Sequence, residues 1–163
     1  MNHSKSAQVK SRFLPVALCA LGMLGSLAAY ADDANNVTNP NPLSVGASQV
    51  SLITMTVSIP AGQVRELAIT HSFECAVGGA GFTSWLEADI YVDGFIISPT
   101  HSDNASCATN NTASQDGWVE TSQTVVRAVG GGLHTVQVRG RVVGGGIARV
   151  DDQSLTVIEE QPI

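Results

Sequence analysis

The feature that most constrains the fold is an alternation of apolar and polar side chains with a period of two. It begins near Ser51 in this chain of 163 residues. That period belongs to an extended strand with one buried face. After residue 31 no stretch of the sequence shows a convincing helical period, so the chain is predicted to be all-β. The first strand ends at Pro60-Ala61-Gly62, and its apolar positions are Ile53, Met55, Val57 and Ile59.

The alternation returns in several later segments. Residues 67–75 and 85–92 each place apolar side chains on one face. Asp93-Gly94 then predicts a type I′ hairpin turn, because both turn positions need a positive φ, and 95–97 is the returning strand. A long polar loop is expected over 98–117. The remaining strand signals lie at 118–129, 134–142, 147–150 and 154–158, and breaks lie at 130–132 and 144–146. Asp151-Asp152 separates the last two segments and suits a bulge or tight turn.

About seven to nine short strands with regular turn signals indicate an antiparallel β-sandwich, jelly-roll-like in arrangement. An immunoglobulin-like sandwich is the alternative. Trp85 does lie between Cys75 and Cys107, as an immunoglobulin domain requires. However, Cys107 falls in the expected loop rather than on a strand. The jelly-roll-like arrangement is therefore favoured.

The N-terminus has the three-part layout of a secretory signal peptide. Lys5, Lys10 and Arg12 precede an apolar run over 13–29, and Ala29-Tyr30-Ala31 supplies the small residues of a cleavage site. A retained membrane anchor is the alternative, but the run is short for a bilayer span. We therefore expect a signal peptide over 1–31, a flexible arm over 32–48 and one β-sandwich domain over 49–163. The mature protein is expected to be secreted, periplasmic or extracellular, without a membrane span.

Charge excludes one class of partner. Cleavage removes three of the eight lysine and arginine residues and none of the fourteen acidic residues, so the net charge changes from −6 to −9. Such a surface repels phosphate, and a nucleic-acid function is therefore excluded. The same charge argues against binding to anionic lipid.

Two cysteines remain after cleavage, Cys75 and Cys107. An even number in a secreted chain predicts a disulfide. Closing a loop of about thirty residues stabilises a fold by roughly 3–4 kcal/mol in the chain-entropy treatment. A metal or redox pair is disfavoured, because the sequence has no Cys-x-x-Cys and no third soft ligand nearby.

Catalytic and metal-binding motifs are not found. The sequence lacks a Gly-x-Ser-x-Gly elbow, a phosphate-binding loop and a His-Glu-x-x-His motif, so we expect no enzyme and no cofactor. His71 and His134 both occupy inward positions of strands and could meet. The preferred interpretation is that each is a buried or half-buried residue bonded to backbone. Asp103 and Asn104 lack the carboxylate density of a calcium loop. No metal site is predicted.

One strand carries the most interesting surface residues, namely Trp85, Glu87, Asp89 and Tyr91 on its outward face. Aromatic rings can stack on sugars while carboxylates accept hydrogen bonds from hydroxyl groups. A carbohydrate-binding module is therefore one hypothesis. The opposing interpretation is that another strand, loop or subunit covers these rings.

A second pair of residues suggests contacts between copies. Arg139 and Arg141 share a strand face and could pair with Glu87 and Asp89 of a neighbouring copy. Cross-strand pairing inside one chain is preferred.

The sequence therefore leaves two hypotheses for the function. The first is a secreted, non-catalytic structural, assembly or adhesion protein that contacts itself or an extracellular protein. The alternative is a module that binds an extracellular polysaccharide.

Overall fold

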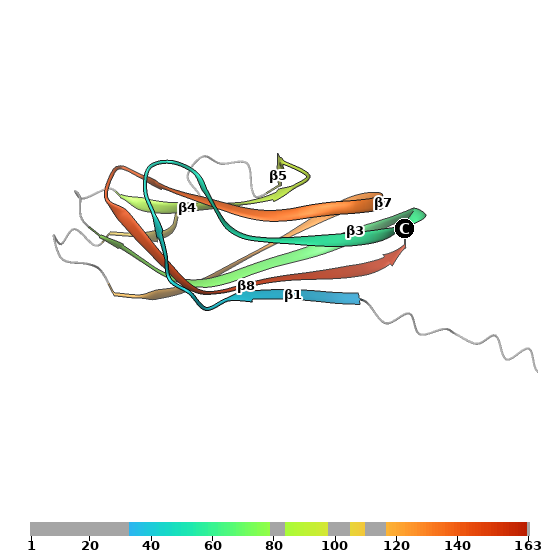
Figure 1. Cartoon of the computed structure of the whole chain (residues 1–163), viewed down its shortest axis with the longest axis horizontal. Coiled ribbons are helices and arrows are strands. Elements are labelled where there is room, and N and C mark those ends of the chain that lie inside the picture. Colours follow the sequence, from blue (N-terminus) through green and yellow to red (C-terminus); the bar gives the residue numbers. More distant parts are fainter. Residues whose placement is uncertain (1–32, 79–83, 98–104, 110–116, 163) are drawn as a thin grey trace, which may run out of the picture.

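The computed structural model describes residues 33–78, 84–97, 105–109 and 117–162, and Figure 1 shows their arrangement. All regular structure in these residues is β, as the sequence predicts. The strands are β1 (Asp33–Asn39), β2 (Leu43–Val45), β3 (Val50–Gly78), β4 (Trp85–Val92), β5 (Phe95–Ile96), β6 (Ala105–Ala108), β7 (Val119–Val143) and β8 (Ile147–Pro162). All pairings between them are antiparallel.

Two unusually long strands, β3 and β7, pair with each other along nearly their whole lengths. The register of this ribbon shifts between Ile59 and Val64, opposite Gly131. A Cβ atom on Gly131 would lie 2.6 Å from the carbonyl oxygen of Pro60, so only glycine fits there. Figure 1 shows β3 reversing its direction near this point. The expectation that 60–62 and 130–132 end strands is therefore wrong: both segments are corners within continuous strands.

The corner folds the ribbon into two packed layers (Figure 1). The β4 layer contains 50–59 of β3, 132–143 of β7, and β4 with β5 and β6. The β8 layer contains 119–130 of β7, 64–78 of β3, and β8 with β1 and β2. Hydrogen bonds cross between the layers: the Gln123 amide donates to the Ala88 carbonyl at 3.0 Å. The predicted antiparallel, jelly-roll-like β-sandwich is confirmed.

The core lies between the inner faces of the two layers. Its apolar residues follow the predicted period of two, because alternate side chains of a strand point to the same face. Burial of such side chains is the dominant stabilising contribution, at about 25 cal/mol per Å² of apolar area. The largest fully buried side chains are Phe73, Leu67, Ile69, Leu86, Ile90, Leu155, His71 and Gln153.

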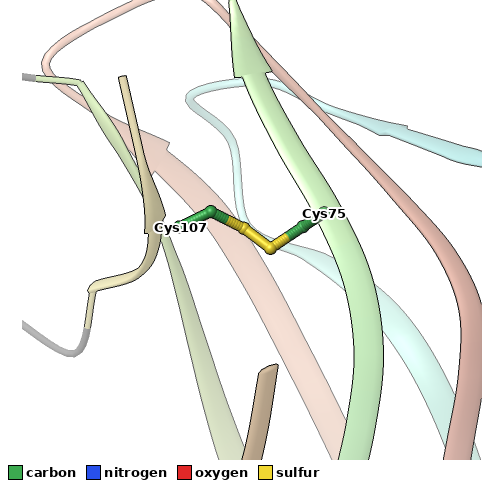
Figure 2. Close-up of a disulfide and its surroundings, with 2 residues drawn as sticks. All are labelled: Cys75 and Cys107. Atoms are coloured by element: carbon green, nitrogen blue, oxygen red, sulfur yellow. A yellow bond between two sulfur atoms is a disulfide. The ribbon is translucent and has the colours of Figure 1, made fainter. Parts of the chain in front are cut away.

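The predicted disulfide forms between Cys75 and Cys107, whose Cα atoms are 6.3 Å apart. Figure 2 shows that it joins β3 to β6. Because β6 pairs with β4, the bond links the two layers. The expectation that 98–117 is loop throughout is corrected, since Ala105–Ala108 forms a strand.

Several turns and the N-terminal segment complete the picture. Asp93 and Gly94 have φ values of 52° and 83°, which confirms the type I′ turn. Asp152, with φ 44°, lies at a register irregularity of β8, as predicted. The expectation of a flexible arm over 32–48 is wrong for β1 and β2, which pair with the side of β8 away from β3. β1 is polar and is ordered mainly by backbone pairing, so its composition gave no strand signal. In β2, by contrast, Val45 is fully buried in the core.

The signal-peptide prediction lies outside the described residues. Within the described part of the chain, no helix is long and apolar enough to cross a membrane.

Candidate functional site

The strip on β4 that the sequence singles out faces away from the core, as expected, but its carboxylates are not exposed. Glu87 and Asp89 have exposed fractions of only 4% and 5%. The Arg141 Nε donates to Glu87 Oε2 at 2.6 Å, and this contact raises the pKa of Arg141. Arg139 lies opposite Asp89 in the register between β4 and β7. The expected exposure of Glu87 and Asp89 is therefore wrong, because cationic side chains of the neighbouring strand lie over this face.

The two aromatic residues of the strip are also engaged. The Arg139 guanidinium lies 4.4 Å from the centre of the Tyr91 ring, a cation–π arrangement. The Tyr91 hydroxyl accepts a hydrogen bond from Gln49 Nε2 at 3.0 Å. Trp85 is half-buried, and its indole N–H has no hydrogen-bond partner among the residues that the structure describes. Binding of a ligand by these four residues stays a prediction.

The polar network of the strip continues onto the next strand of the β4 layer. Arg139 Nε donates to the Gln137 side-chain oxygen at 2.6 Å. The Gln137 amide in turn donates to Ser51 at 3.0 Å and to Thr54 at 3.2 Å. Cross-strand pairing inside one chain, which the sequence analysis preferred, is what the structure shows for Arg141 and Glu87. The outer face of the β4 layer is thus bonded to itself.

The two histidines do not form a common site. His71 stacks on Phe73 with ring centres 4.4 Å apart. Neither ring nitrogen has a hydrogen-bond partner among the described residues, so the expected bond to backbone is not found there. Burial lowers the pKa of His71 to about 4, against a smaller opposing effect of the nearby Gln153 side chain. His134 instead bonds Asp93 at 2.7 Å and the Gly130 carbonyl at 2.8 Å. Its pKa is raised, mainly by the hydrogen bond to Asp93.

Metal binding finds no support in the described ranges. They contain no group of three or more histidine, cysteine, aspartate or glutamate side chains that could hold a metal ion.

Sequence reasoning missed the outer face of the β8 layer. There, three rows of side chains cross the four strands β1, β8, β3 and β7, and none of the twelve is charged. We call this surface the hydroxyl face. Its rows are Ala34, Ile158, Ala68 and Val126; Asn36, Thr156, Thr70 and Thr124; and Thr38, Ser154, Ser72 and Ser122.

Hydroxyl groups of this face bond one another across the strands. Thr70 and Thr124 oxygens are 2.9 Å apart, and Ser72 donates to Ser122 at 3.0 Å. The Asn36 amide donates to Thr156 at 2.7 Å. Each strand's polar positions are visible in the sequence, but the sequence does not show the register that aligns them into rows.

The hydroxyl face ends at two edge strands. Residues 119–130 of β7 pair only with β3 among the described residues, and β1 pairs only with β8. Side chains at both edges are exposed, and Val126 is 57% exposed. Neither Asp33 nor Arg127, at opposite edges, has an ion pair within the described part of the chain. Among the described residues, the β8 layer thus ends on each side in an edge strand that pairs with only one neighbour.

Comparison with known proteins supports the fold. No family model and no curated protein sequence matches the chain. A solved chain of infectious bursal disease virus, Gt strain, is similar with a TM-score of 0.50 and 14% identity, over 78% of this chain and 33% of that chain. A chain of the Gx strain gives 0.42 and 12%, over 81% and 37%. Dimeric latent PorU from Porphyromonas gingivalis gives 0.41 and 16%, over 80% and 13%.

The first of these similarities shows a shared β-sandwich fold and nothing more specific. This chain spans about a third of the length of that viral chain.

Proposed function

We propose that this protein is a secreted, non-catalytic structural β-sandwich that assembles with copies of itself in the periplasm or the extracellular space. The observation that carries the proposal is the β8 layer, whose hydroxyl face is uncharged and whose two edge strands have no second partner among the described residues. Edge strands of this kind present unpaired backbone groups to other chains. The fold shared with a chain of a virus particle is compatible with such a role.

Electrostatics favours contact through this layer. With the signal peptide removed the chain carries a net charge of −9, so two copies repel each other over most approaches. The three rows of the hydroxyl face carry no charge, although Glu66, Glu74 and Glu120 flank them on the same face. Two copies can therefore approach with little repulsion only along these rows.

The carbohydrate-binding alternative has weaker support. A sugar platform needs accessible ring faces and free carboxylate acceptors. One face of Tyr91 lies beneath Arg139, and Glu87 is bound by Arg141. No comparable aromatic residue lies on the hydroxyl face.

Sedimentation velocity on the purified, oxidised protein tests the proposal. We expect the sedimentation coefficient to increase with protein concentration, with Cys75 and Cys107 bonded. A single monomer at every concentration, together with retention on a polysaccharide matrix, would overturn the assembly function and favour the alternative. Recovery of the protein outside the cytoplasm with Asp32 at its N-terminus is the expected result for its localisation.

A further inference from the structure

The β8 layer has two different edges, and their side chains match each other. The edge of β7 runs over 119–130, without lysine, proline or a bulge to discourage pairing with another strand. The edge of β1 runs over 33–39. Across the layer the four strands alternate in direction, so β7 of one copy and β1 of the next would meet antiparallel.

From this match we infer that copies of the chain join edge to edge, with β1 of one copy added beside 119–130 of β7 of the next. The inference rests on the proposed assembly function and names its interface. A contact between two different edges is heterologous, and it extends into an open row of copies rather than closing into a dimer. Main-chain hydrogen bonds would supply the attraction, as in other cases of strand addition.

The rows of the hydroxyl face set the register of this contact. The row of Asn36, Thr156, Thr70 and Thr124 runs straight across one copy. Continuing it into the next copy places Thr124 beside Asn36 of the second copy. The same register places Ser122 beside Thr38 and Val126 beside Ala34, so small uncharged side chains meet on the outer face.

Charge complementarity supports the same register independently. On the inner side of the strands, one row contains Asp33, Glu159, Leu67 and Arg127. Continuing this row into the next copy places Arg127 opposite Asp33 of that copy. A charge on an edge strand discourages most incoming strands. Here the incoming strand β1 carries the opposite charge, Asp33, directly opposite Arg127 in the register. Arg127 therefore favours β1 over other strands.

The two edges cannot satisfy each other within one copy. β8 and β3 lie between β1 and β7, and three strand spacings amount to about 14 Å. Arg127 and Asp33 therefore meet only between copies. This separation makes the interface testable by cross-linking.

Cysteine trapping tests the inference. A double variant with Asn36→Cys and Thr124→Cys places thiols at positions that face each other only between copies. Neighbouring antiparallel residues have Cα atoms about 4.5–5.5 Å apart, which suits a disulfide. Mild oxidation is expected to produce a ladder of covalent multimers on a non-reducing gel.

A matched control keeps one thiol and moves the other along the same face of β7. The variant with Asn36→Cys and Ala128→Cys displaces the second thiol by about 13 Å. It is expected to form few covalent multimers, and therefore to run mainly as a monomer on the non-reducing gel. The single variant Thr124→Cys is also expected to form no covalent dimer on this gel. The contact is not two-fold, so two copies of Cys at this position do not meet.

The outcomes separate the interface from the function. Covalent dimers of the single variant would overturn the inference in favour of two-fold pairing of β7. An absent ladder in a protein that still self-associates by sedimentation would overturn this interface while leaving the assembly function in place. An absent ladder in a protein that stays monomeric would overturn both.

Discussion

At the scale of single residues, His71 is the most unusual group in the core. It is fully buried and stacks on Phe73, and within the described part of the chain neither ring nitrogen has a hydrogen-bond partner. The sequence correctly placed it on an inward strand position. Its state could not be foreseen, because period-two alternation gives the face of a side chain but not its polar surroundings. The structure holds this imidazole in its neutral form.

We expect acid to destabilise the fold through His71. Its pKa is lowered to about 4 in the folded protein, from about 6.5 when unfolded, so between these values the unfolded state binds more protons. The free energy of unfolding should therefore decrease by about 3 kcal/mol from pH 7 to pH 4. Urea unfolding at several pH values would measure this decrease.

The variant His71→Leu is the matched comparison for that titration. It should lose most of this pH dependence while matching or exceeding the stability of the wild type at pH 7, since it removes two unpartnered polar atoms. His134 contributes with the opposite sign, because its pKa is raised by Asp93. That contribution is present below the unfolded pKa of histidine and is lost as the pH rises through the folded one. An unchanged acid slope in His71→Leu would contradict the assignment.

At the scale of structural elements, the corner of the β3–β7 ribbon decides the architecture. Proline and glycine at 60–62 and 130–132 predicted strand ends, whereas β3 and β7 continue through both segments and bend there. A turn and a corner require the same residue types, so the sequence alone does not separate them. A corner differs from a turn in that β3 and β7 pair with each other both before and after the bend, and only the register of the two strands reveals this.

Gly131→Ala is expected to destabilise the protein by about 1–3 kcal/mol. The added Cβ would lie 2.6 Å from the Pro60 carbonyl oxygen and 2.9 Å from the Ala61 Cα, both backbone atoms of the opposite strand. Gly130→Ala is the control, since a Cβ there meets nothing within 4 Å. Chemical unfolding of both variants checks this difference. Equal stability of the two would show that the corner tolerates a side chain.

The link between β3 and β6 gives a second prediction at this scale. Replacing Cys75 and Cys107 together by serine should lower the free energy of unfolding by roughly 3–4 kcal/mol, because a loop of 32 residues is no longer closed in the unfolded chain. Comparison of the wild type and the double variant in urea, both without reductant, measures the effect. A loss below about 1 kcal/mol would mean that the other contacts between the layers suffice.

Other elements show where sequence reasoning succeeded and failed. The Asp93-Gly94 turn and the irregularity at Asp152 were predicted correctly, because each requires a specific backbone conformation. β1 was missed because a polar edge strand is held by hydrogen bonds to the backbone of its partner. Such a strand does not require alternating apolar residues, so its sequence shows no period of two. The burial of Glu87 and Asp89 was missed because it depends on Arg139 and Arg141, which lie far away in the sequence.

At the scale of the whole molecule, the two outer faces of the sandwich differ. The face of the β4 layer is bonded to itself through Arg139, Arg141 and Gln137. The hydroxyl face is uncharged and bordered by two edges with complementary residues, Asp33 and Arg127. Because of this difference we propose assembly through the β8 layer, with an interface that depends on one pair of charges between copies.

The most direct test of this account is light scattering on two charge-reversal variants, alone and mixed. Arg127→Asp and Asp33→Arg each place like charges at the interface between copies, so each alone should remain monomeric where the wild type assembles. In an equal mixture every contact between unlike copies again joins opposite charges, and assembly should return. Assembly of either variant to the extent of the wild type, or a mixture that stays monomeric beside an assembling wild type, would contradict the account.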